Sequence, residues 1–484
     1  MIYFAAAELA PFAKVGGLAD VVGSLPKALA HLGIETTILF PHYADLNLEG
    51  AEVVSTDEVL LVPIGDGTQT VTLSKTMLPG SSVPVLLFGH DAWIGNGGTY
   101  ASAPLPDLPK VDPNLPRFAL FSAAVAKYVA EHAKPGTILH AHDWHVAASI
   151  PILKNAYGTA HVSTLLTIHN LAYQGGTGFA AARTVFGDDL LKTLPKEALL
   201  GEEPHKWYNL LLAGILTADW VSTVSPSYRN EILTPEYGEK LEWALAQRDD
   251  RLVGILNGVD TQGWDPATDP KIAAPYDVDT LQKKQQNKAK LQEELSLPVD
   301  ADAPLFGMVS RLAEQKGFAI FLPAIPEMLA AVPGLQLAFL ATGDPQYAAD
   351  LKALEERFPD RVAFHDRFDE HLAHQIYAGS DAFFIPSRFE PCGLGQLFAM
   401  RYGTLPIARS TGGLKDTVTN GETGFRFDTY TSEALLEVVQ RAAEVFRNDP
   451  TTWNAMVKNA MAYDSTWSAS AELYQRLYQA MVSS

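Results

Sequence analysis

Residues 305–341 read LFGMVSRLAEQKGFAIFLPAIPEMLAAVPGLQLAFLA, and this stretch determines the fold class that the sequence predicts. An apolar run at 305–309 leads through a polar turn into a helix-length segment that begins near Gly317, and a second apolar run follows at 335–341. Strand, helix and strand in this order are typical of two parallel strands joined by a helix. The sequence therefore predicts an α/β protein.

The same alternation extends along the whole chain. In the second half, further strands are expected at 362–364, 382–386 and 405–408, with helices that begin near Pro345, Glu370, Gly393 and Gly413. In the first half, strands are expected at 2–7, 36–40, 83–88, 137–140, 163–168 and 220–224, and a β-hairpin insertion at 51–89. The carboxyl ends of parallel strands form the ligand crevice of such sheets, so polar residues that follow each strand are candidate site residues.

The length of 484 residues exceeds what a single hydrophobic core supports, so two domains are expected. The segment 257–277 is rich in Asp, Pro and Gly, which suits a connection between domains, and we place the hinge near 245–260. This predicts a first domain at 1–247 and a second at 248–463. Residues 464–484 carry apolar side chains at helical spacing, and we expect this helix to cover the first domain.

Composition excludes several classes of partner. The chain has 36 basic and 56 acidic residues, which gives a net charge of −20. The electric field of such a chain repels nucleic acid and anionic lipid outside a locally basic pocket.

The lone Cys392 forms no intrachain disulfide and no multi-thiolate metal site, which fits a reducing cytoplasm. Residues 1–17 lack a basic region and carry Glu8, so they predict a buried strand rather than a secretory signal. The apolar stretch 207–224 contains an Asn and an Asp, which disfavours a membrane span.

Two segments share the pattern GGL-x-D-x-V: KVGGLADVV at 14–22 and STGGLKDTV at 410–418. Each copy stands at a predicted junction between a strand and a helix. Paired glycines let a ligand approach the backbone closely and leave the first helical N–H groups free to hold an anion. A tight turn with a surface Asp explains either copy alone, but one copy in each half favours a ligand bound between the domains.

The familiar nucleotide and hydrolase fingerprints are absent from the sequence: G-x-G-x-x-G after the first strand, G-x-x-x-x-G-K-[ST], H-E-x-x-H and G-x-S-x-G. Instead, SRLAEQKG at 310–317 puts Arg311 and Lys316 beside a helix N-terminus. A guanidinium and an ammonium there suit a diphosphate leaving group, although two cations in a loop can also be merely solvated. In PSRFEPCGLGQ at 386–396, Glu390 ends a loop before the next helix.

Together these four motifs resemble bacterial glycogen synthases and plant starch synthases, and the resemblance covers essentially the whole chain in the right order. It implies a GT-B fold, with two Rossmann-like doubly wound domains and an active site between them. It also implies retaining transfer of α-glucose from ADP-glucose to the non-reducing 4-OH of an α-1,4-glucan, without metal or cofactor. The sequence does not decide between ADP and UDP as carrier, between glycogen and starch as acceptor, or between covalent and ion-pair-like retention, nor does it give the oligomeric state.

The resemblance also implies roles for individual residues. Lys14, Gly16, Gly17 and Asp20 would face the donor near its phosphate and sugar, Arg311 and Lys316 would neutralise the diphosphate, and Glu390 would bind the glucose hydroxyls. The amides of Gly393 and Leu394 would lie beside Glu390. Thr411, Gly412 and Gly413 would lie near the phosphates. Phe368 would stack on adenine. Glu8, Asn170 and Asn257 complete the predicted substrate contacts. Phe398 stands where the wider clan often has a ribose-binding Glu, so ribose must be held otherwise.

Two histidine motifs remain. His169 ends the strand of TIHN at 167–170, where the family places a His at the reacting sugar; a core His is the alternative. HAHDWH at 140–145 resembles a hydrolase metal cluster, since imidazoles and a carboxylate can ligate zinc. Against zinc, His140 is predicted inside a buried strand, and we keep Asp143 as a sugar or acceptor contact. A metal-dependent hydrolase and a glucan-binding protein without catalysis stay open as alternatives.

Overall fold

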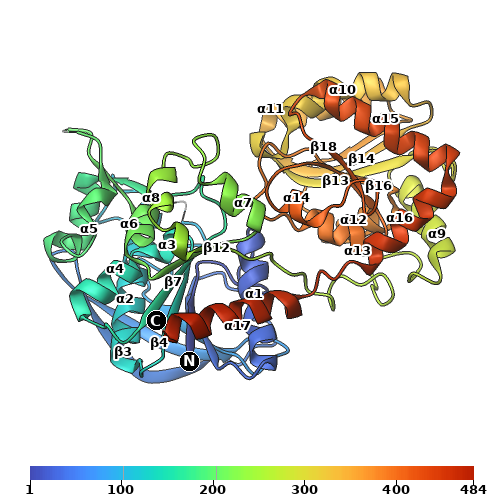
Figure 1. Ribbon diagram of the computed structural model, residues 1–484. Helices are drawn as coiled ribbons and strands as arrows, with labels where there is room; N and C mark the ends of the chain where they lie inside the picture. The colour runs from blue at the N-terminus through green and yellow to red at the C-terminus, as the bar shows by residue number, and fades with distance from the viewer. Residues whose placement is uncertain (102, 203, 484) are drawn as a thin grey trace. The chain divides into compact units, whose positions relative to one another are not determined.

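The computed structural model describes residues 1–101, 103–202 and 204–483, and it divides into two compact units. The first comprises Met1–Gly258 and the residues from Trp467 onward, and the second comprises Val259–Thr466 (Figure 1). The chain therefore leaves the first unit once and returns to it for its last helix. Within the described residues, no helix is both long enough and apolar enough to cross a membrane.

The first unit is built on a nine-stranded sheet in the order β12-β11-β7-β6-β1-β2-β5-β4-β3. Its seven parallel strands are β1 (Ile2–Ala5), β2 (Thr36–Pro41), β5 (Pro84–Gly89), β6 (Ile138–His142), β7 (Ser163–Ile168), β11 (Trp220–Thr223) and β12 (Leu252–Gly254). The antiparallel hairpin of β3 (Val54–Ile64) and β4 (Gly67–Met77) extends one edge. The predicted hairpin insertion is thus confirmed. A small sheet of β8 (Gly176–Gly178), β9 (Leu199–Leu200) and β10 (Trp207–Asn209) lies outside the large one.

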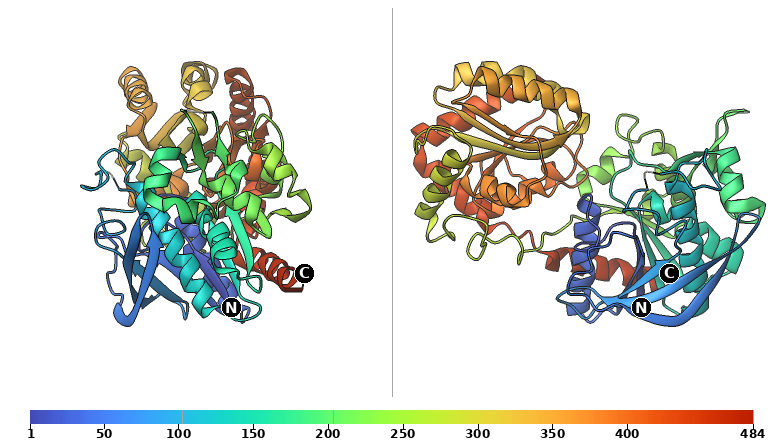
Figure 2. Two further views of the ribbon diagram at one scale, coloured as in Figure 1. Left: turned by 90° about the vertical axis from the view of Figure 1, so that its left-hand side faces the viewer. Right: turned by 180° about the vertical axis from the view of Figure 1, so that it is seen from behind.

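Helices cover both faces of this sheet because its central strands are apolar on both sides. One face packs on α1 (Gly17–His31) and α17 (Trp467–Ser483), and Figure 2 shows these two helices side by side. The other face packs on α2 (Asn114–His132), α4 (Ser149–Tyr157) and α6 (Leu210–Thr217). The other α-helices of this unit are α3 (Trp144–Ala147), α5 (Phe179–Leu191), α7 (Pro226–Glu231) and α8 (Glu242–Ala246).

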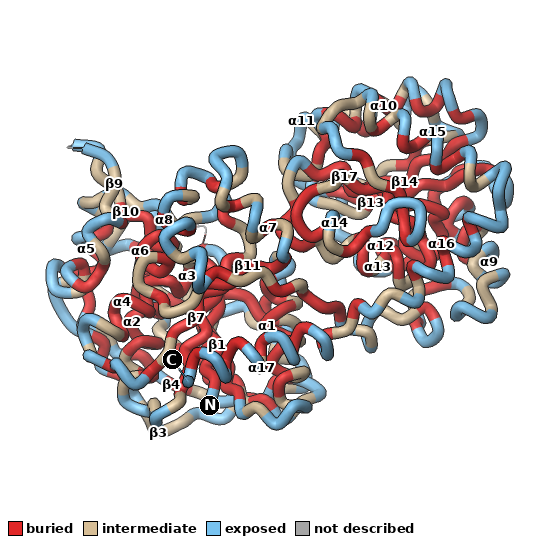
Figure 3. The backbone as a smooth tube through the Cα atoms, viewed as in Figure 1, coloured by how far each residue is buried: buried red, intermediate tan, exposed pale blue. Residues whose placement is uncertain are grey.

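The second unit has a six-stranded, all-parallel sheet in the order β15-β14-β13-β16-β17-β18. The strands are β13 (Leu305–Leu312), β14 (Gln336–Gly343), β15 (Val362–His365), β16 (Ala382–Ile385), β17 (Leu405–Arg409) and β18 (Phe425–Phe427). Figure 3 shows the central strands of both large sheets in the buried class, and exposed stretches on the edge hairpin of β3 and β4 and on the surrounding helices and loops. The α/β class and the parallel sheets predicted from the alternation are confirmed.

The helices of the second unit are α9 (Lys284–Glu294), α10 (Phe318–Ala331), α11 (Pro345–Arg357), α12 (Glu370–Gly379), α13 (Gly395–Arg401), α14 (Gly412–Thr417), α15 (Ser432–Asn448) and α16 (Pro450–Ala462). One start was wrongly predicted at Gly393. That residue has a φ of +73°, a left-handed conformation outside the helical region, and α13 begins two residues later.

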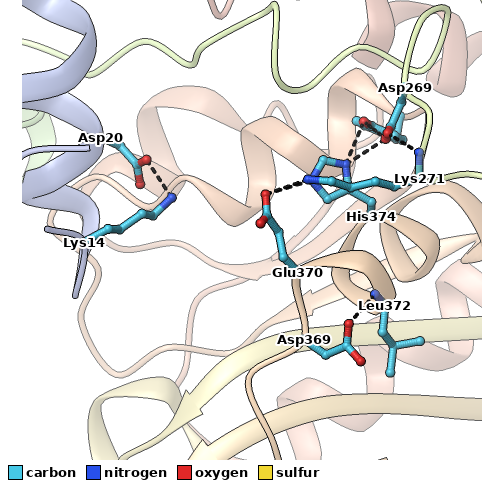
Figure 4. Close-up of polar contacts among 9 residues, drawn as sticks. Lys14, Asp20, Asp269, Lys271, Asp369, Glu370, Leu372 and His374 are labelled. Atoms are coloured by element: carbon cyan, nitrogen blue, oxygen red, sulfur yellow. Dashed lines mark hydrogen bonds and ion pairs between the residues drawn. The ribbon is translucent and has the colours of Figure 1, made fainter. Parts of the chain in front are cut away.

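The segment that enters the second unit is held by a buried carboxylate. Asp269 Oδ2 accepts hydrogen bonds from His374 Nδ1 at 2.7 Å and from the Tyr402 hydroxyl at 2.6 Å. Lys271, two residues further on, pairs with Glu370 at 2.6 Å (Figure 4). These contacts fix the start of the unit to α12 and to the end of α13.

A second buried carboxylate joins α9 to the central strands. Asp381 Oδ2 lies 2.8 Å from Lys288 Nζ and accepts a hydrogen bond from the Leu305 amide at 2.9 Å. The Lys288 and Asp381 side chains are only 2% and 7% exposed. Removing either charge would leave the other buried without its counter-ion, and that is the costly way to break such a pair.

We therefore expect Asp381→Ala to lower the free energy of unfolding of the second unit by about 3–5 kcal/mol. Lys290→Ala, which removes a largely exposed pair with Glu293 on the same helix, should cost less than about 1 kcal/mol. Urea unfolding of the full chain, followed by fluorescence and circular dichroism, measures both. Equal effects of the two variants would contradict the role assigned to the buried pair.

Candidate active site

Three loops of the second unit meet where its strand order reverses. β13 has β14 on one side and β16 on the other, and ligands of open α/β sheets bind at such a switch point. The loop after β13 contacts the loop after β16, because the Arg388 amide donates to the Gln315 carbonyl at 2.8 Å. The loop after β17 joins them, because the Gly413 amide donates to the Glu390 carbonyl at 3.1 Å.

Two glycines permit this close approach. Gly317 has a φ of +85°, and a Cβ there would lie 2.0 Å from the Pro386 carbonyl oxygen. Gly412 has a φ of +46°, and its Cβ would lie 1.9 Å from the Glu390 carbonyl oxygen. Any side chain at either position would push two loops apart, so the glycines of the KG and TGG motifs are needed for the loop packing itself.

The structure brings Lys316 and Glu390 together in one ion pair. Lys316 Nζ lies 2.6 Å from Glu390 Oε2, and the Ser387 hydroxyl donates to the same oxygen at 2.8 Å. The Glu390 side chain is 8% exposed and that of Lys316 is 20% exposed. Arg311 is exposed, and within the described residues its guanidinium forms no hydrogen bond or ion pair. The sequence predicted the three charges but not the pairing, and it gave no signal for Ser387.

The remaining predicted residues of this unit lie on the same loops or near them. Leu394 is the N-cap of α13, and the buried Thr411 is the N-cap of α14. The Gly413 amide is used by the loop contact with Glu390. Phe368 precedes α12 and is 85% exposed, as a side chain that stacks on a ligand would be. Phe398 stacks on Trp264 with ring centroids 4.1 Å apart, so its ring is used in packing within the unit.

In the first unit the strand order reverses at β1, which lies between β2 and β6. Glu8 follows β1, and its Oε2 accepts hydrogen bonds from the Gly16 amide at 2.7 Å and the Val15 amide at 3.2 Å. Its Oε1 accepts the Tyr100 hydroxyl at 2.8 Å. Glu8 thus holds the GGL loop, and the Gly16 amide is already used within the protein. The sequence gave no signal for Tyr100.

The other residues of the GGL motif lie close by. Lys14 Nζ pairs with Asp20 Oδ1 at 2.7 Å, from the loop to the first turn of α1 (Figure 4). Gly16 is the N-cap of that helix, and Gly17 is its first residue. Both members of the ion pair are partly exposed, so a ligand can reach them.

Asp143 and His169 follow the neighbouring strands β6 and β7. The His169 amide donates to Asp143 Oδ1 at 2.7 Å. Burial raises the pKa of Asp143 to about 7, and the nearby charge of Glu8 acts in the same direction, while the amides of His169 and Asn170 oppose it. Burial lowers the pKa of His169 to about 3, so its ring is neutral at pH 7. Asn257, which follows β12, is buried, and its Oδ1 has no hydrogen-bond partner within the described residues.

The comparisons with known proteins agree with this geometry. A family model described as the starch synthase catalytic domain matches residues 1–247, and one described as glycosyl transferases group 1 matches residues 290–460. The chain belongs to the glycogen and starch synthase family. A glycogen synthase of Kosmotoga olearia is 43% identical over 495 residues, covering 100% of this chain and 98% of that protein. One of Thermotoga maritima is 39% identical over 494 residues, covering 99% and 98%.

A solved structure gives the same family. The catalytic domain of starch synthase IV from Arabidopsis thaliana, bound to ADP and acarbose, has a TM-score of 0.88 at 33% identity and covers 100% of this chain and 99% of that one. A sucrose-phosphate synthase from Thermosynechococcus elongatus, with a TM-score of 0.59 at 20% identity, shares the fold. The GT-B fold and the glucosyltransferase class predicted from the motifs are confirmed.

Membership of this family does not support the metal-dependent hydrolase considered for residues 140–145. Both ring nitrogens of His140 are hydrogen-bonded. Nδ1 lies 2.8 Å from the Tyr478 hydroxyl, and Nε2 lies 2.6 Å from the Thr167 hydroxyl. Neither nitrogen is therefore available as a metal ligand. In the part of the chain that the structure describes, no group of three or more His, Cys, Asp or Glu residues is arranged to hold a metal ion.

The raised pKa of Asp143 predicts a pH-dependent contribution to stability. The folded state binds this proton more tightly than the unfolded chain, so the contribution is complete below about pH 4 and is lost as the pH rises towards 7. Relative to Asp143→Asn, the wild type should therefore lose roughly 4 kcal/mol of unfolding free energy across that range. Urea unfolding of both proteins at intervals of pH measures the difference. A difference that does not vary with pH would contradict the prediction.

Proposed function

We propose that the chain transfers α-glucose from ADP-glucose to the non-reducing 4-OH of an α-1,4-glucan, with retention of configuration, and releases ADP. The relatives named glycogen synthase and the starch synthase structure bound to ADP and acarbose support this donor and this acceptor class. The observation that carries the proposal is the ion pair of Lys316 and Glu390 at the switch point of the second sheet.

The two members of this pair suit the two halves of a nucleotide sugar. As the bond between C1 of glucose and the phosphate oxygen breaks, negative charge accumulates on the diphosphate, and an ammonium and a guanidinium stabilise it there. We assign these roles to Lys316 and Arg311. A carboxylate accepts hydrogen bonds from sugar hydroxyls, and we assign this role to Glu390. When the donor binds, the contact between Lys316 and Glu390 breaks. Lys316 then contacts the phosphate, and Glu390 contacts the sugar.

The bond changes in the proposed transfer are balanced. The acceptor O4 attacks C1 from the face that ADP leaves, the C1–O4 bond forms, and the bond between C1 and the phosphate oxygen breaks with its electron pair on the phosphate. The departing phosphate takes the proton of the acceptor hydroxyl. Cations beside that phosphate are therefore central to the rate. In the first unit, Asp143, whose pKa burial raises to about 7, and the neutral His169 suit contacts to sugar hydroxyls.

Lys316→Ala tests the assignment. It removes charge stabilisation that grows in the transition state, so kcat should fall about 10²–10³-fold while KM for ADP-glucose changes much less. Lys352→Ala, at an exposed position of α11, serves as the control and should behave like wild type. Release of ADP in the presence of glycogen measures both. A change confined to KM would show that Lys316 does not act on the leaving group.

A further inference from the structure

His169 is held by a second imidazole that the proposed function does not use. His142 is the last residue of β6 and stands opposite Thr167 of β7, two residues before His169. Because side chains alternate along a strand, this register brings the two rings to the same side. His142 Nδ1 lies 3.0 Å from His169 Nε2, a hydrogen bond between two ring nitrogens.

His142 itself is fully enclosed. It has no exposed surface, Phe4 stacks on its ring with centroids 5.4 Å apart, and the His140 ring lies at 4.1 Å. Its Nε2 has no hydrogen-bond partner within the described residues. Burial lowers the pKa of His142 well below the usual range, as it does for His169, so both rings are neutral at pH 7. A single proton therefore lies between them.

The position of this proton follows from the surroundings of His142. If the proton belonged to His169 Nε2, His142 would accept it at Nδ1 and would carry its own proton on Nε2, as a buried N–H without an acceptor. If the proton belongs to His142 Nδ1, only a lone pair is left unpaired at Nε2. Buried N–H groups without an acceptor are rarer in folded proteins than unpaired acceptors.

We infer that His142 is a positioning residue that keeps His169 in the tautomer with its proton on Nδ1. His169 is only partly buried, and within the described residues its Nδ1 forms no hydrogen bond. The pair thus presents a neutral N–H donor to a ligand, and a sugar hydroxyl oxygen is the matching acceptor. This inference rests on the proposed function, in which His169 faces the reacting sugar.

The tautomer can be observed without any substrate. Nitrogen-15 spectra of the full chain, labelled at histidine, report which ring nitrogen of His169 is protonated, and the signals are assigned by their loss in His169→Asn. We expect protonated Nδ1 in the wild type. Protonated Nε2 in the wild type would overturn the inference. Because this readout involves no donor or acceptor, it stands or falls separately from the proposed function.

Variants of His142 test whether it is the cause. The amide nitrogen of Asn can take the place of Nδ1, whereas that of Gln lies nearer to Nε2. His142→Asn should keep the His169 tautomer and keep kcat/KM within about 2-fold, and His142→Gln should lose the tautomer and reduce kcat/KM about 3- to 10-fold, the effect of one hydrogen bond between neutral groups. Equal behaviour of the two variants would overturn the inference.

Tyr478→Phe supplies a matched control. It removes the hydroxyl that contacts His140 in the same buried cluster but leaves the His142–His169 contact in place. We expect the wild-type tautomer and unchanged kcat/KM, even if stability falls. A tautomer change in this variant would show that general loosening of the cluster, rather than the His142 contact, controls His169, and would overturn the inference.

Discussion

The ion pair between Lys316 and Glu390 is the interaction on which the candidate site of the second unit depends. Its members come from loops that leave the neighbouring parallel strands β13 and β16, and Gly317 and Gly412 allow those loops to touch the loops beside them. The pair places one positive and one negative charge where the strand order reverses, and Arg311 adds a second cation. A diphosphate and a sugar are the two halves of a ligand that matches these charges.

The first unit presents a different kind of surface at the corresponding edge of its sheet. Asp143 has a pKa raised to about 7, His169 is neutral, and Glu8 is used to hold the Gly16 amide. These groups offer hydrogen-bond donors and acceptors at the ends of β1, β6 and β7. Hydrogen-bonding groups of this kind can contact sugar hydroxyls, which agrees with the sugar contacts that we propose for this unit.

The sequence predicted the features that depend on local pattern. Periodicity along the sequence predicted the apolar runs that form β13 and β14 and the hairpin of β3 and β4. The polar loops after the strands were predicted in the same way, from the Gly, Ser and Asp residues that follow each run. The start of α13 was predicted two residues too early because the sequence pattern did not reveal the positive φ of Gly393. The roles assigned to the site residues, and the division of the chain at 247 and 248, stay predictions.

Contacts between distant segments could not be predicted. Lys316 and Glu390 are 74 residues apart, and Tyr100 is 92 residues from Glu8. Their meeting depends on strand order and register, which no local pattern contains. His142 was grouped with His140 and Asp143 as a metal-like motif, and only the pairing of β6 with β7 shows that its partner is His169.

The most direct test of the central claim is a double-mutant cycle of Lys316→Met and Glu390→Gln, with ADP affinity measured by calorimetry. If Lys316 leaves Glu390 to contact the phosphate of ADP, removing the charge of Glu390 should make ADP bind more tightly. Glu390→Gln should therefore tighten ADP binding only where Lys316 is present, with a coupling energy of about 1 kcal/mol or more. Glucosyl transfer should be lost in the same Glu390→Gln protein. Effects on ADP affinity that add to within about 0.3–0.5 kcal/mol would contradict the account.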